Sequence, residues 1–338
     1  MAANGTPASA NEKPPPLLLL RPSNDRLNTA LRSRFRVISF SDDSSGGTPD
    51  LQAFLAASAA AKEPPPRAAL VVGGGTVVVD AAFLHAAPHL RCLVTTSTGM
   101  DHIDLAECAR RGVVVASAGE TYSIDVADHA VGLLIDALRR VSAADRYVRR
   151  GLWPVQGDYP LGSKLGGKRV GIIGLGSIGS LIAKRLQAFG CVIQYHSRTP
   201  KQTAASFKYF PNVINLAAES DVLIVACALN SQTRHIINKD VLEALGTDGV
   251  LVNIARGGNI DEAALIAALK GREIAGAGLD VFEKEPVVPP EFFSMDNVVL
   301  TAHDAAFTTE SDRDLCQLMI ANLDAFFQGK PLVTPVFP

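Results

Sequence analysis

The 338-residue sequence has little of what marks several classes of protein. It has one Trp, 6% aromatic residues, and no apolar run long enough to span a membrane. Its formal net charge is −2, so nothing drives the whole chain toward nucleic acid or an anionic membrane. The five cysteines contain no Cys-x-x-Cys pair and mostly lie in apolar runs, which indicates reduced core residues of an intracellular protein.

Recognisable targeting segments are also lacking. Leu17–Leu20 is too short for the core of a signal peptide, and residues 1–16 are small, polar and Pro-rich, which predicts a disordered extension. The chain ends in Val-Phe-Pro and not in a peroxisomal Ser-Lys-Leu signal. We therefore expect a cytoplasmic protein that binds neither nucleic acid nor a membrane, and we assign no metal site.

What the sequence does have is a glycine-rich turn near its centre. An apolar run at 170–173 precedes Gly174, Gly176 and Gly179, which form the pattern G-x-G-x-x-G. A helical pattern follows and ends at Gly190, and a second apolar run covers 191–195. This order of strand, turn, helix and strand predicts a dinucleotide site, the alternative being a turn that packs without a ligand.

Each glycine of this turn has a physical reason in a dinucleotide site. Gly174 allows a tight turn, Gly176 lets a pyrophosphate approach the backbone, and Gly179 lets the helix pack close to the sheet. The helix begins near Ser177 and Ile178, where free N–H groups would face the phosphates.

The end of the second strand predicts which dinucleotide binds. NAD sites usually place Asp or Glu there, but this chain has Ser197, Arg198 and Thr199. Arg198 can pair with a 2′-phosphate, and the two hydroxyls can donate to it. The sequence therefore favours NADP(H). NAD(H) remains possible, with Arg198 then an ordinary surface residue.

The remaining pattern predicts an α/β protein of two domains. Apolar runs alternate with helical patterns, which indicates parallel sheets. Strands are expected at 17–20, 34–40, 68–72, 93–96, 113–116, 221–226, 250–254, 277–281 and 298–301. Helices are expected at 51–61, 80–87, 103–111, 241–245 and 261–270, with one long helix at 125–149 and another at 311–327 that returns to the first domain.

Three polar residues follow apolar strands of the second half, where open parallel sheets bind ligands. Arg256 enters a glycine turn and could bind a carboxylate or carbonyl oxygen. His303 beside Glu285 would form an acid–base pair, because a carboxylate favours the protonated imidazole. Asp304 and Glu283 are rival partners for His303. Taken singly, Arg256 could be a surface residue and His303 a structural one.

These motifs resemble the D-isomer-specific 2-hydroxyacid dehydrogenase family, especially plant hydroxypyruvate and hydroxyphenylpyruvate reductases. The resemblance covers nearly the whole chain after Leu17. It rests on the segments 98–105, 174–179, 253–257 and 278–286 and on His303.

The resemblance implies two Rossmann-like or flavodoxin-like domains with parallel sheets, the cofactor domain being inserted in the substrate domain. The substrate-binding domain would be residues 17–121 and 307–338, and the NAD(P)-binding domain residues 122–306. The family usually forms a homodimer, in which Trp153 would reach the partner's active site or simply pack in the interface.

The resemblance also implies roles for single residues. Arg256 would bind the keto acid, Glu285 would support the catalytic histidine, and His303 would be the general acid. Ala255 and Asp280 would lie in the cofactor site, Asp280 near the nicotinamide carboxamide. The substrate carboxylate would be held by backbone N–H groups around Gly74, Gly75, Thr98 and Gly99.

The chain departs from the family around the histidine. Ala302 stands where Pro is common, and Asp304 and Phe307 replace small residues. Asp304 would add negative charge near an anion site, and Phe307 could line or narrow the pocket. Ala228 also stands where many relatives have Pro, beside the cofactor.

We expect an NADPH-dependent reductase of a small 2-keto acid that yields the D-2-hydroxy acid. Hydroxypyruvate or glyoxylate is the first candidate substrate, and hydroxyphenylpyruvate the second. The alternative from another class is a non-catalytic nicotinamide-binding sensor, like the corepressors that share this fold. Such a protein would need the glycine turn but no acid–base pair.

Overall fold

The computed structural model describes residues 13–40, 53–54, 64–73 and 77–338. The chain divides into two compact units, unit 1 (residues 1–121 and 309–338) and unit 2 (residues 122–308). Most of the expected disordered extension and almost all of the expected helix at 51–61 lie outside the described residues. Of the helices that the structure does describe, none combines the length and the apolar character needed to cross a membrane.

The sheet of unit 1 has the strand order β13-β5-β4-β3-β1-β2. Strands β1 to β5 are parallel, in the order of flavodoxin-like sheets, and β13 adds an antiparallel edge that the sequence did not predict. The strands are β1 (Pro16–Leu20), β2 (Arg36–Phe40), β3 (Ala68–Val71), β4 (Cys92–Thr95), β5 (Val114–Ala116) and β13 (Pro335–Val336).

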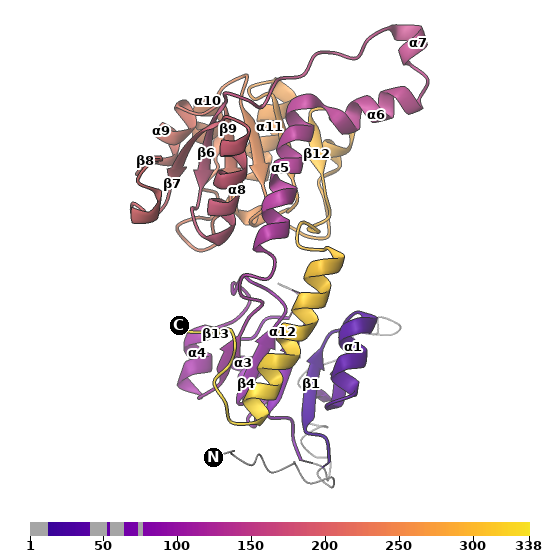
Figure 1. Cartoon of the computed structure of the whole chain (residues 1–338), viewed down its shortest axis with the longest axis vertical. Coiled ribbons are helices and arrows are strands. Elements are labelled where there is room, and N and C mark those ends of the chain that lie inside the picture. Colours follow the sequence, from indigo (N-terminus) through magenta and orange to yellow (C-terminus); the bar gives the residue numbers. More distant parts are fainter. Residues whose placement is uncertain (1–12, 41–52, 55–63, 74–76) are drawn as a thin grey trace, which may run out of the picture. The chain divides into compact units, whose positions relative to one another are not determined.

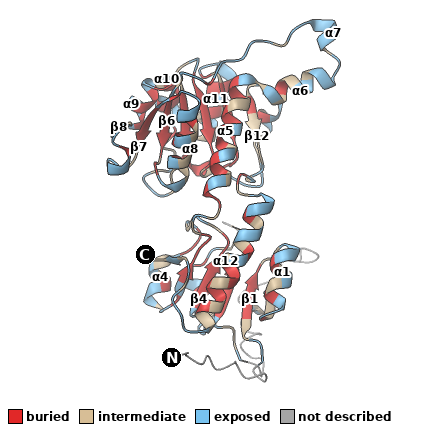
Figure 2. Cartoon of the chain, viewed as in Figure 1, coloured by how far each residue is buried: buried red, intermediate tan, exposed pale blue. Residues whose placement is uncertain are grey.

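Helices cover both faces of this sheet, because alternate side chains of each strand point to opposite faces. Leu17 and Leu19 pack with helices α1 and α12, whereas Leu18 and Leu20 pack with α3 and α4. The helices are α1 (Asp25–Arg32), α3 (Ala81–Ala86), α4 (Leu105–Arg110) and α12 (Thr309–Phe327). The C-terminal helix therefore completes the core of unit 1, as expected, and Figure 2 shows the buried strands beneath it.

The sheet of unit 2 is fully parallel, with the order β12-β11-β10-β9-β6-β7-β8. Its strands are nearly all buried, as expected for a sheet covered on both faces. They are β6 (Arg169–Ile173), β7 (Val192–His196), β8 (Lys208–Phe210), β9 (Val222–Val225), β10 (Val250–Asn253), β11 (Gly276–Leu279) and β12 (Val298–Leu300).

One face of this sheet packs against α9, α10 and α11, and α5 and α8 pack together on its strands as well. Gly278 makes room for α5, since a Cβ there would lie 3.0 Å from Leu133 Cβ. The helices are α5 (Ser123–Arg139), α8 (Ser177–Ala188), α9 (Val213–Ala218), α10 (Lys239–Leu245) and α11 (Glu262–Gly271), with 3-10 turns η1 (Gln202–Ala204), η2 (Gly257–Asn259) and η3 (Pro290–Ser294).

The single long helix expected at 125–149 is wrong. The chain forms α5 and then α6 (Val141–Arg149), because Arg140 between them has a left-handed backbone with φ +56°. The Asp136 carboxylate accepts hydrogen bonds from the backbone N–H (2.8 Å) and the hydroxyl of Ser142. This side chain supplies a cap in the middle of an apolar helical pattern, where the periodicity alone continues smoothly.

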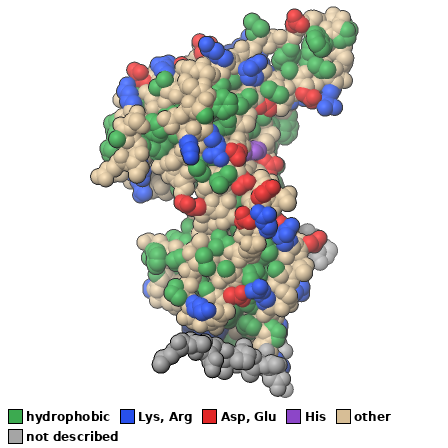
Figure 3. Space-filling model, viewed as in Figure 1, with side chains coloured by type: hydrophobic (Ala, Val, Ile, Leu, Met, Phe, Trp, Pro, Cys, Tyr) green, Lys and Arg blue, Asp and Glu red, His purple; other side chains and the backbone are tan. Residues whose placement is uncertain are grey.

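Helix α6 and the short α7 (Trp153–Gln156) form an arm that extends from the sheet of unit 2 (Figure 1). The arm exposes several large apolar side chains, namely Val148, Trp153 and Val155, and Leu161 follows it with 94% of its surface exposed. Figure 3 shows hydrophobic side chains gathered there.

Candidate active site

The residues expected to do chemistry lie at one edge of the unit 2 sheet. Because all its strands are parallel, their carboxyl ends meet at the same edge. Gly174 follows β6, Arg256 follows β10, and His303 comes shortly after β12. Strand β6 lies between β7 and β9, so the chain leaves it in one direction and later returns on its other side. This is the switch point at which open α/β sheets bind ligands.

The glycine turn between β6 and α8 has the shape that a dinucleotide requires. Gly174 has φ +98°, and a Cβ there would lie 2.7 Å from the backbone nitrogen of Cys227. A Cβ at Gly179 would lie 2.1 Å from the Gly174 carbonyl oxygen, so only glycine lets α8 start this close to the turn. A Cβ at Gly176 would meet nothing within 4 Å. Gly176 therefore has open space above it, and the first residues of α8, Ser177 and Ile178, present its N-terminus.

The end of β7 carries no carboxylate. The strand ends at His196, and exposed Arg198 follows two residues later. Among the described residues Arg198 forms no hydrogen bond or ion pair, so its guanidinium is free to bind an anion. The Ser197 hydroxyl instead donates to the Thr199 carbonyl oxygen (2.6 Å) and so closes the turn beside Arg198.

Two buried asparagines shape the turn that carries Arg256. Asn253 accepts from the Ala255 N–H (3.0 Å) and donates to the Arg256 carbonyl (2.9 Å). Asn259 accepts from the Arg256 N–H (3.1 Å) and donates to the Thr233 carbonyl (3.1 Å). Both are fully buried, so this hydrogen bonding is protected from water. The spacing Asn-x-x-Arg-x-x-Asn is visible in the sequence, but we had not assigned Asn259 a role.

Gly257 brings this turn against the loop that carries Glu285. A Cβ at Gly257 would lie 1.8 Å from the carbonyl carbon of Phe282, so any other residue would push the two loops apart. The Arg256 turn and the Glu285 loop therefore touch through their backbones.

His303 and Glu285 form a hydrogen-bonded pair. His303 Nδ1 lies 2.7 Å from Glu285 Oε2, and Glu285 Oε1 accepts the Phe282 N–H at 2.9 Å. An ionised carboxylate only accepts hydrogen bonds, so Nδ1 carries the proton in this pair. His303 Nε2 makes no hydrogen bond within the described residues and is the nitrogen left for a substrate.

The pair shifts both pKa values toward the charged forms. The hydrogen bond that His303 donates to Glu285 and the charge of Glu285 raise the pKa of His303 above its ordinary 6.5, against burial and the positive charge of Arg256. Burial by itself would raise the pKa of Glu285, but the hydrogen bonds from His303 and Phe282 N–H outweigh it, so this pKa is lowered. The pair thus favours the protonated histidine more than an ordinary imidazole would be favoured at the same pH.

The two rival carboxylates have other partners. Glu283 pairs with His235. Asp304 Oδ1 lies 3.9 Å from His129 Nε2, and its backbone N–H donates to Asp280. Glu285 alone of the three candidates hydrogen-bonds His303 in the described structure.

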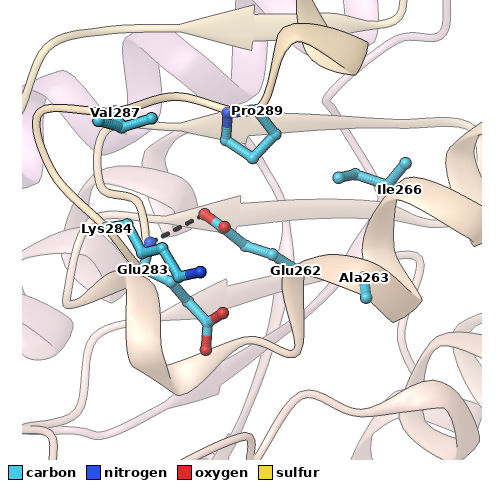
Figure 4. Close-up of a pocket in the computed structure, with 7 residues that line it drawn as sticks. All are labelled: Glu262, Ala263, Ile266, Glu283, Lys284, Val287 and Pro289. Carbon is cyan, nitrogen blue, oxygen red and sulfur yellow. Dashed lines mark hydrogen bonds between the residues drawn. The ribbon is translucent and has the colours of Figure 1, made fainter.

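A small pocket of about 260 Å³ lies behind the Glu283 loop and is lined by Ile266, Val287 and Pro289 beside Glu262 and Lys284 (Figure 4). The Glu262 carboxylate points to the Glu283 backbone N–H and accepts its hydrogen bond at 2.9 Å. Burial raises the pKa of Glu262. This carboxylate supports the loop and is not aimed at the sheet edge.

The other expected site residues are divided between the two units. Thr98 and Gly99 follow β4, and the Thr98 hydroxyl donates to the Gly119 carbonyl (3.2 Å). Gly74 and Gly75 lie outside the described residues. In unit 2, Ala255 lies between Asn253 and Arg256, and Asp280 is 1% exposed directly after β11.

Comparison with known proteins identifies the family. Residues 131–305 match the model of the D-isomer specific 2-hydroxyacid dehydrogenase, NAD binding domain. The chain is 55% identical over 249 residues to a glyoxylate/hydroxypyruvate reductase of Arabidopsis thaliana (74% of this chain, 77% of that protein). It is 47% identical over 257 residues to a hydroxyphenylpyruvate reductase of Plectranthus scutellarioides (76% and 82%).

Solved structures agree over almost the whole chain. A 2-hydroxyacid dehydrogenase from Ketogulonicigenium vulgare matches with a TM-score of 0.86 at 36% identity, covering 96% of this chain and 99% of that one. An NADPH-dependent glyoxylate/hydroxypyruvate reductase from Sinorhizobium meliloti, in complex with NADP and malonate, matches with a TM-score of 0.84 at 36% identity (96% and 97%). The chain belongs to the D-isomer specific 2-hydroxyacid dehydrogenase family.

Proposed function

We propose that this protein reduces a small 2-keto acid, hydroxypyruvate or glyoxylate, to the D-2-hydroxy acid with NADPH. The observation that carries the proposal is the His303–Glu285 pair, at the same sheet edge as the glycine turn and Arg256. The names of the Arabidopsis and Sinorhizobium relatives support it.

The residues have separate tasks in this reaction. Arg256 binds the carboxylate and carbonyl oxygens of the keto acid through its planar fork of N–H donors. When bound, NADPH would supply the hydride that adds to C2. His303 Nε2 then gives its proton to the carbonyl oxygen, which becomes the hydroxyl. Glu285 holds the imidazole in place and favours the protonated form that this step consumes.

The preference for NADPH follows from Arg198. It is exposed, unpaired among the described residues and located after β7, where a 2′-phosphate would lie. The open space over Gly176 fits a pyrophosphate at the N-terminus of α8, with Gly174, Ser177, Ile178 and Gly179 around it. Ser197, Thr199, Ala255 and Asp280 complete the proposed cofactor site.

We assign substrate binding to unit 1 and cofactor binding to unit 2. In unit 1, backbone N–H groups near Gly74, Gly75, Thr98 and Gly99 would bind the substrate carboxylate. Hydroxyphenylpyruvate is a second candidate substrate, favoured by the Plectranthus relative. A non-catalytic sensor is the weaker proposal, because such a protein has no use for a buttressed acid–base pair.

We further propose a cytoplasmic homodimer that buries the α6–α7 arm. Its exposed Val148, Trp153 and Val155 form an apolar surface of a kind that usually marks an interface.

Steady-state oxidation of NADPH with a panel of keto acids tests the function. We expect turnover with glyoxylate or hydroxypyruvate, and a loss of about 100-fold or more in kcat for His303→Gln or Arg256→Ala. NADPH binding, followed by fluorescence, should survive in both variants. Full activity of His303→Gln would refute the assignment, and binding of NADPH without turnover of any keto acid would favour the sensor.

A further inference from the structure

A chain of side-chain hydrogen bonds lies behind His303, and two of its members, His129 and Thr301, have no task in the steps above. The Thr301 hydroxyl donates to Asp280 Oδ1 at 2.7 Å, and His129 Nε2 lies 3.0 Å from Thr301 Oγ1. Because the hydroxyl proton is directed to Asp280, Thr301 Oγ1 accepts from His129 Nε2–H. The chain thus runs from α5 through the end of β12 to the end of β11.

Asp280 also accepts hydrogen bonds from the turn that carries the catalytic histidine. Its carbonyl oxygen accepts the His303 N–H (2.7 Å), Oδ1 accepts the Asp304 N–H (3.0 Å), and Oδ2 accepts the Ala305 N–H (3.3 Å). Three consecutive backbone donors therefore converge on one residue that is 1% exposed.

The turn needs such support because His303 is strained. Its φ is +54°, in the left-handed region that costs a residue with a Cβ about 1–2 kcal/mol. Strained residues persist only where their surroundings impose the conformation. Here the hydrogen bonds of Asp280 hold the backbone, and the side chain consequently reaches Glu285.

A metal ion is the competing explanation, since atoms of His129, Asp280 and Asp304 lie within 4.8 Å of one another. Asp280 Oδ1 already accepts two hydrogen bonds and Oδ2 accepts one. The His129 nitrogen that faces the group carries a hydrogen, whereas a metal needs its lone pair. The hydrogen-bond chain thus accounts for Asp280 and His129 without an ion.

We propose that His129 and Thr301 are positioning residues for reduction, which act through Asp280 to hold His303 on Glu285. This inference rests on the proposed function, in which His303 is the general acid. It assigns His129 and Thr301 a task that differs from binding substrate or cofactor.

The test compares Thr301→Val, which keeps the shape but removes the hydroxyl, with Thr301→Ser, which keeps the hydroxyl. His129→Leu removes the outer donor, and His85→Leu, on the exposed side of α3, is its matched control. We expect Thr301→Val and His129→Leu to lower kcat about 10- to 100-fold, as misplaced catalytic groups do, with little change in the Kd for NADPH. Thr301→Ser and His85→Leu should stay within about threefold of wild type.

A second readout needs neither substrate nor cofactor. Titration of the His303 imidazole by NMR should show its pKa raised in the wild type by Glu285 and lower in Thr301→Val and His129→Leu, because the pair is then misaligned. Wild-type kcat and wild-type His303 titration in both variants would overturn the inference. A loss of kcat that EDTA reproduces and a divalent cation restores in the wild type would favour the metal ion.

The two proposals fail separately. If the wild type reduces no keto acid, the proposed function falls, while the NMR titration still decides whether Thr301 and His129 align His303 with Glu285. If Thr301→Val does not fold, as judged by circular dichroism, His129→Leu at a half-buried helix position carries the test.

Discussion

At the scale of single residues, His303 and Glu285 act as a coupled pair. Each raises the population of the charged form of the other, and the charge of Arg256 acts on both. His303, the proposed general acid, is therefore protonated below a pKa that lies above the ordinary value of histidine. Reduction needs the proton, so its rate is full below this pKa and falls as the pH rises through it.

Removing the Glu285 carboxylate should move this fall to lower pH. In Glu285→Gln the group that raises the His303 pKa most is gone, whereas burial and Arg256, which lower it, remain. The measurement is kcat/KM for keto acid reduction as a function of pH. Glu283→Gln is the matched control, because Glu283 pairs with His235, and its profile should follow the wild type. An unshifted profile in Glu285→Gln would contradict the role of the pair.

Arg198 has no partner side chain among the described residues, in contrast to His303. Because we propose that it binds the 2′-phosphate, its replacement should change the choice of cofactor. Arg198→Gln should raise KM for NADPH about 10- to 100-fold, because a charged hydrogen bond to phosphate is worth about 1.5–3 kcal/mol. KM for NADH should stay nearly constant. Lys184→Gln, an exposed cation on α8, is the control. A wild type that uses NADH with the higher kcat/KM would show that Arg198 does not select the cofactor.

At the scale of secondary-structure elements, the turn between β6 and α8 contains two glycines that are needed for different reasons. Gly179 is needed by the fold itself, since a Cβ there meets the Gly174 carbonyl oxygen. Gly176 is not, since a Cβ there meets nothing. The same motif thus holds one glycine that packing requires and one that leaves open space, where we propose that the pyrophosphate binds.

The two alanine substitutions should therefore behave differently. Gly179→Ala should lower the free energy of unfolding by about 1–3 kcal/mol, as overpacking does. Gly176→Ala should unfold like the wild type but bind NADPH at least about tenfold more weakly, because its methyl group occupies the space of the pyrophosphate. Thermal unfolding and fluorescence titration measure the two effects. Normal NADPH binding by Gly176→Ala would place the pyrophosphate elsewhere.

At the scale of the whole molecule, the chain builds unit 1 from both of its ends and unit 2 from its middle. Helix α12 closes the core of unit 1, while the α6–α7 arm leaves its apolar side chains exposed. Because these apolar side chains are exposed, the arm is the surface that we propose a second copy of the chain covers.

Charging the arm should reduce the proposed dimer to a monomer. Val155→Glu places a carboxylate on an apolar surface that the dimer would bury, and light scattering after size exclusion measures the mass. Phe293→Glu, an exposed apolar position outside the arm, should leave the mass unchanged. A wild-type monomer, or a dimer that survives Val155→Glu, would contradict this interface.

Trp153 can be assigned with the same assay. If it reaches the active site of the partner, Trp153→Ala should raise KM for the keto acid while the protein stays dimeric. If it only packs in the interface, the same change should weaken the dimer, and KM should follow the loss of dimer.

Patterns along the sequence are enough to predict many of the strands and helices. They also show which strand ends of unit 2 carry the candidate site residues. A strand of a parallel sheet that is covered on both faces has every side chain buried. Apolar runs of four to five residues are therefore typical of such strands. Asp80, Asp104 and Asp261 cap their helices with side chains that accept from backbone N–H groups three residues later, a local interaction that needs no distant partner. Parallel strands bring their carboxyl ends to one edge, so Arg256, Glu285 and His303 could be named as one group.

Which carboxylate hydrogen-bonds His303 depends on contacts between distant parts of the chain. Glu283, Glu285 and Asp304 are equivalent by spacing, but the strained turn at His303 and the bonds of Asp280 direct the imidazole to Glu285 alone. The sequence pattern also does not predict the break between helices at Arg140 or the hydrogen bond between His129 and Thr301. The Asp136 carboxylate caps the start of α6, and His129 meets a residue 172 positions away. Neither contact leaves a periodic signal in the sequence.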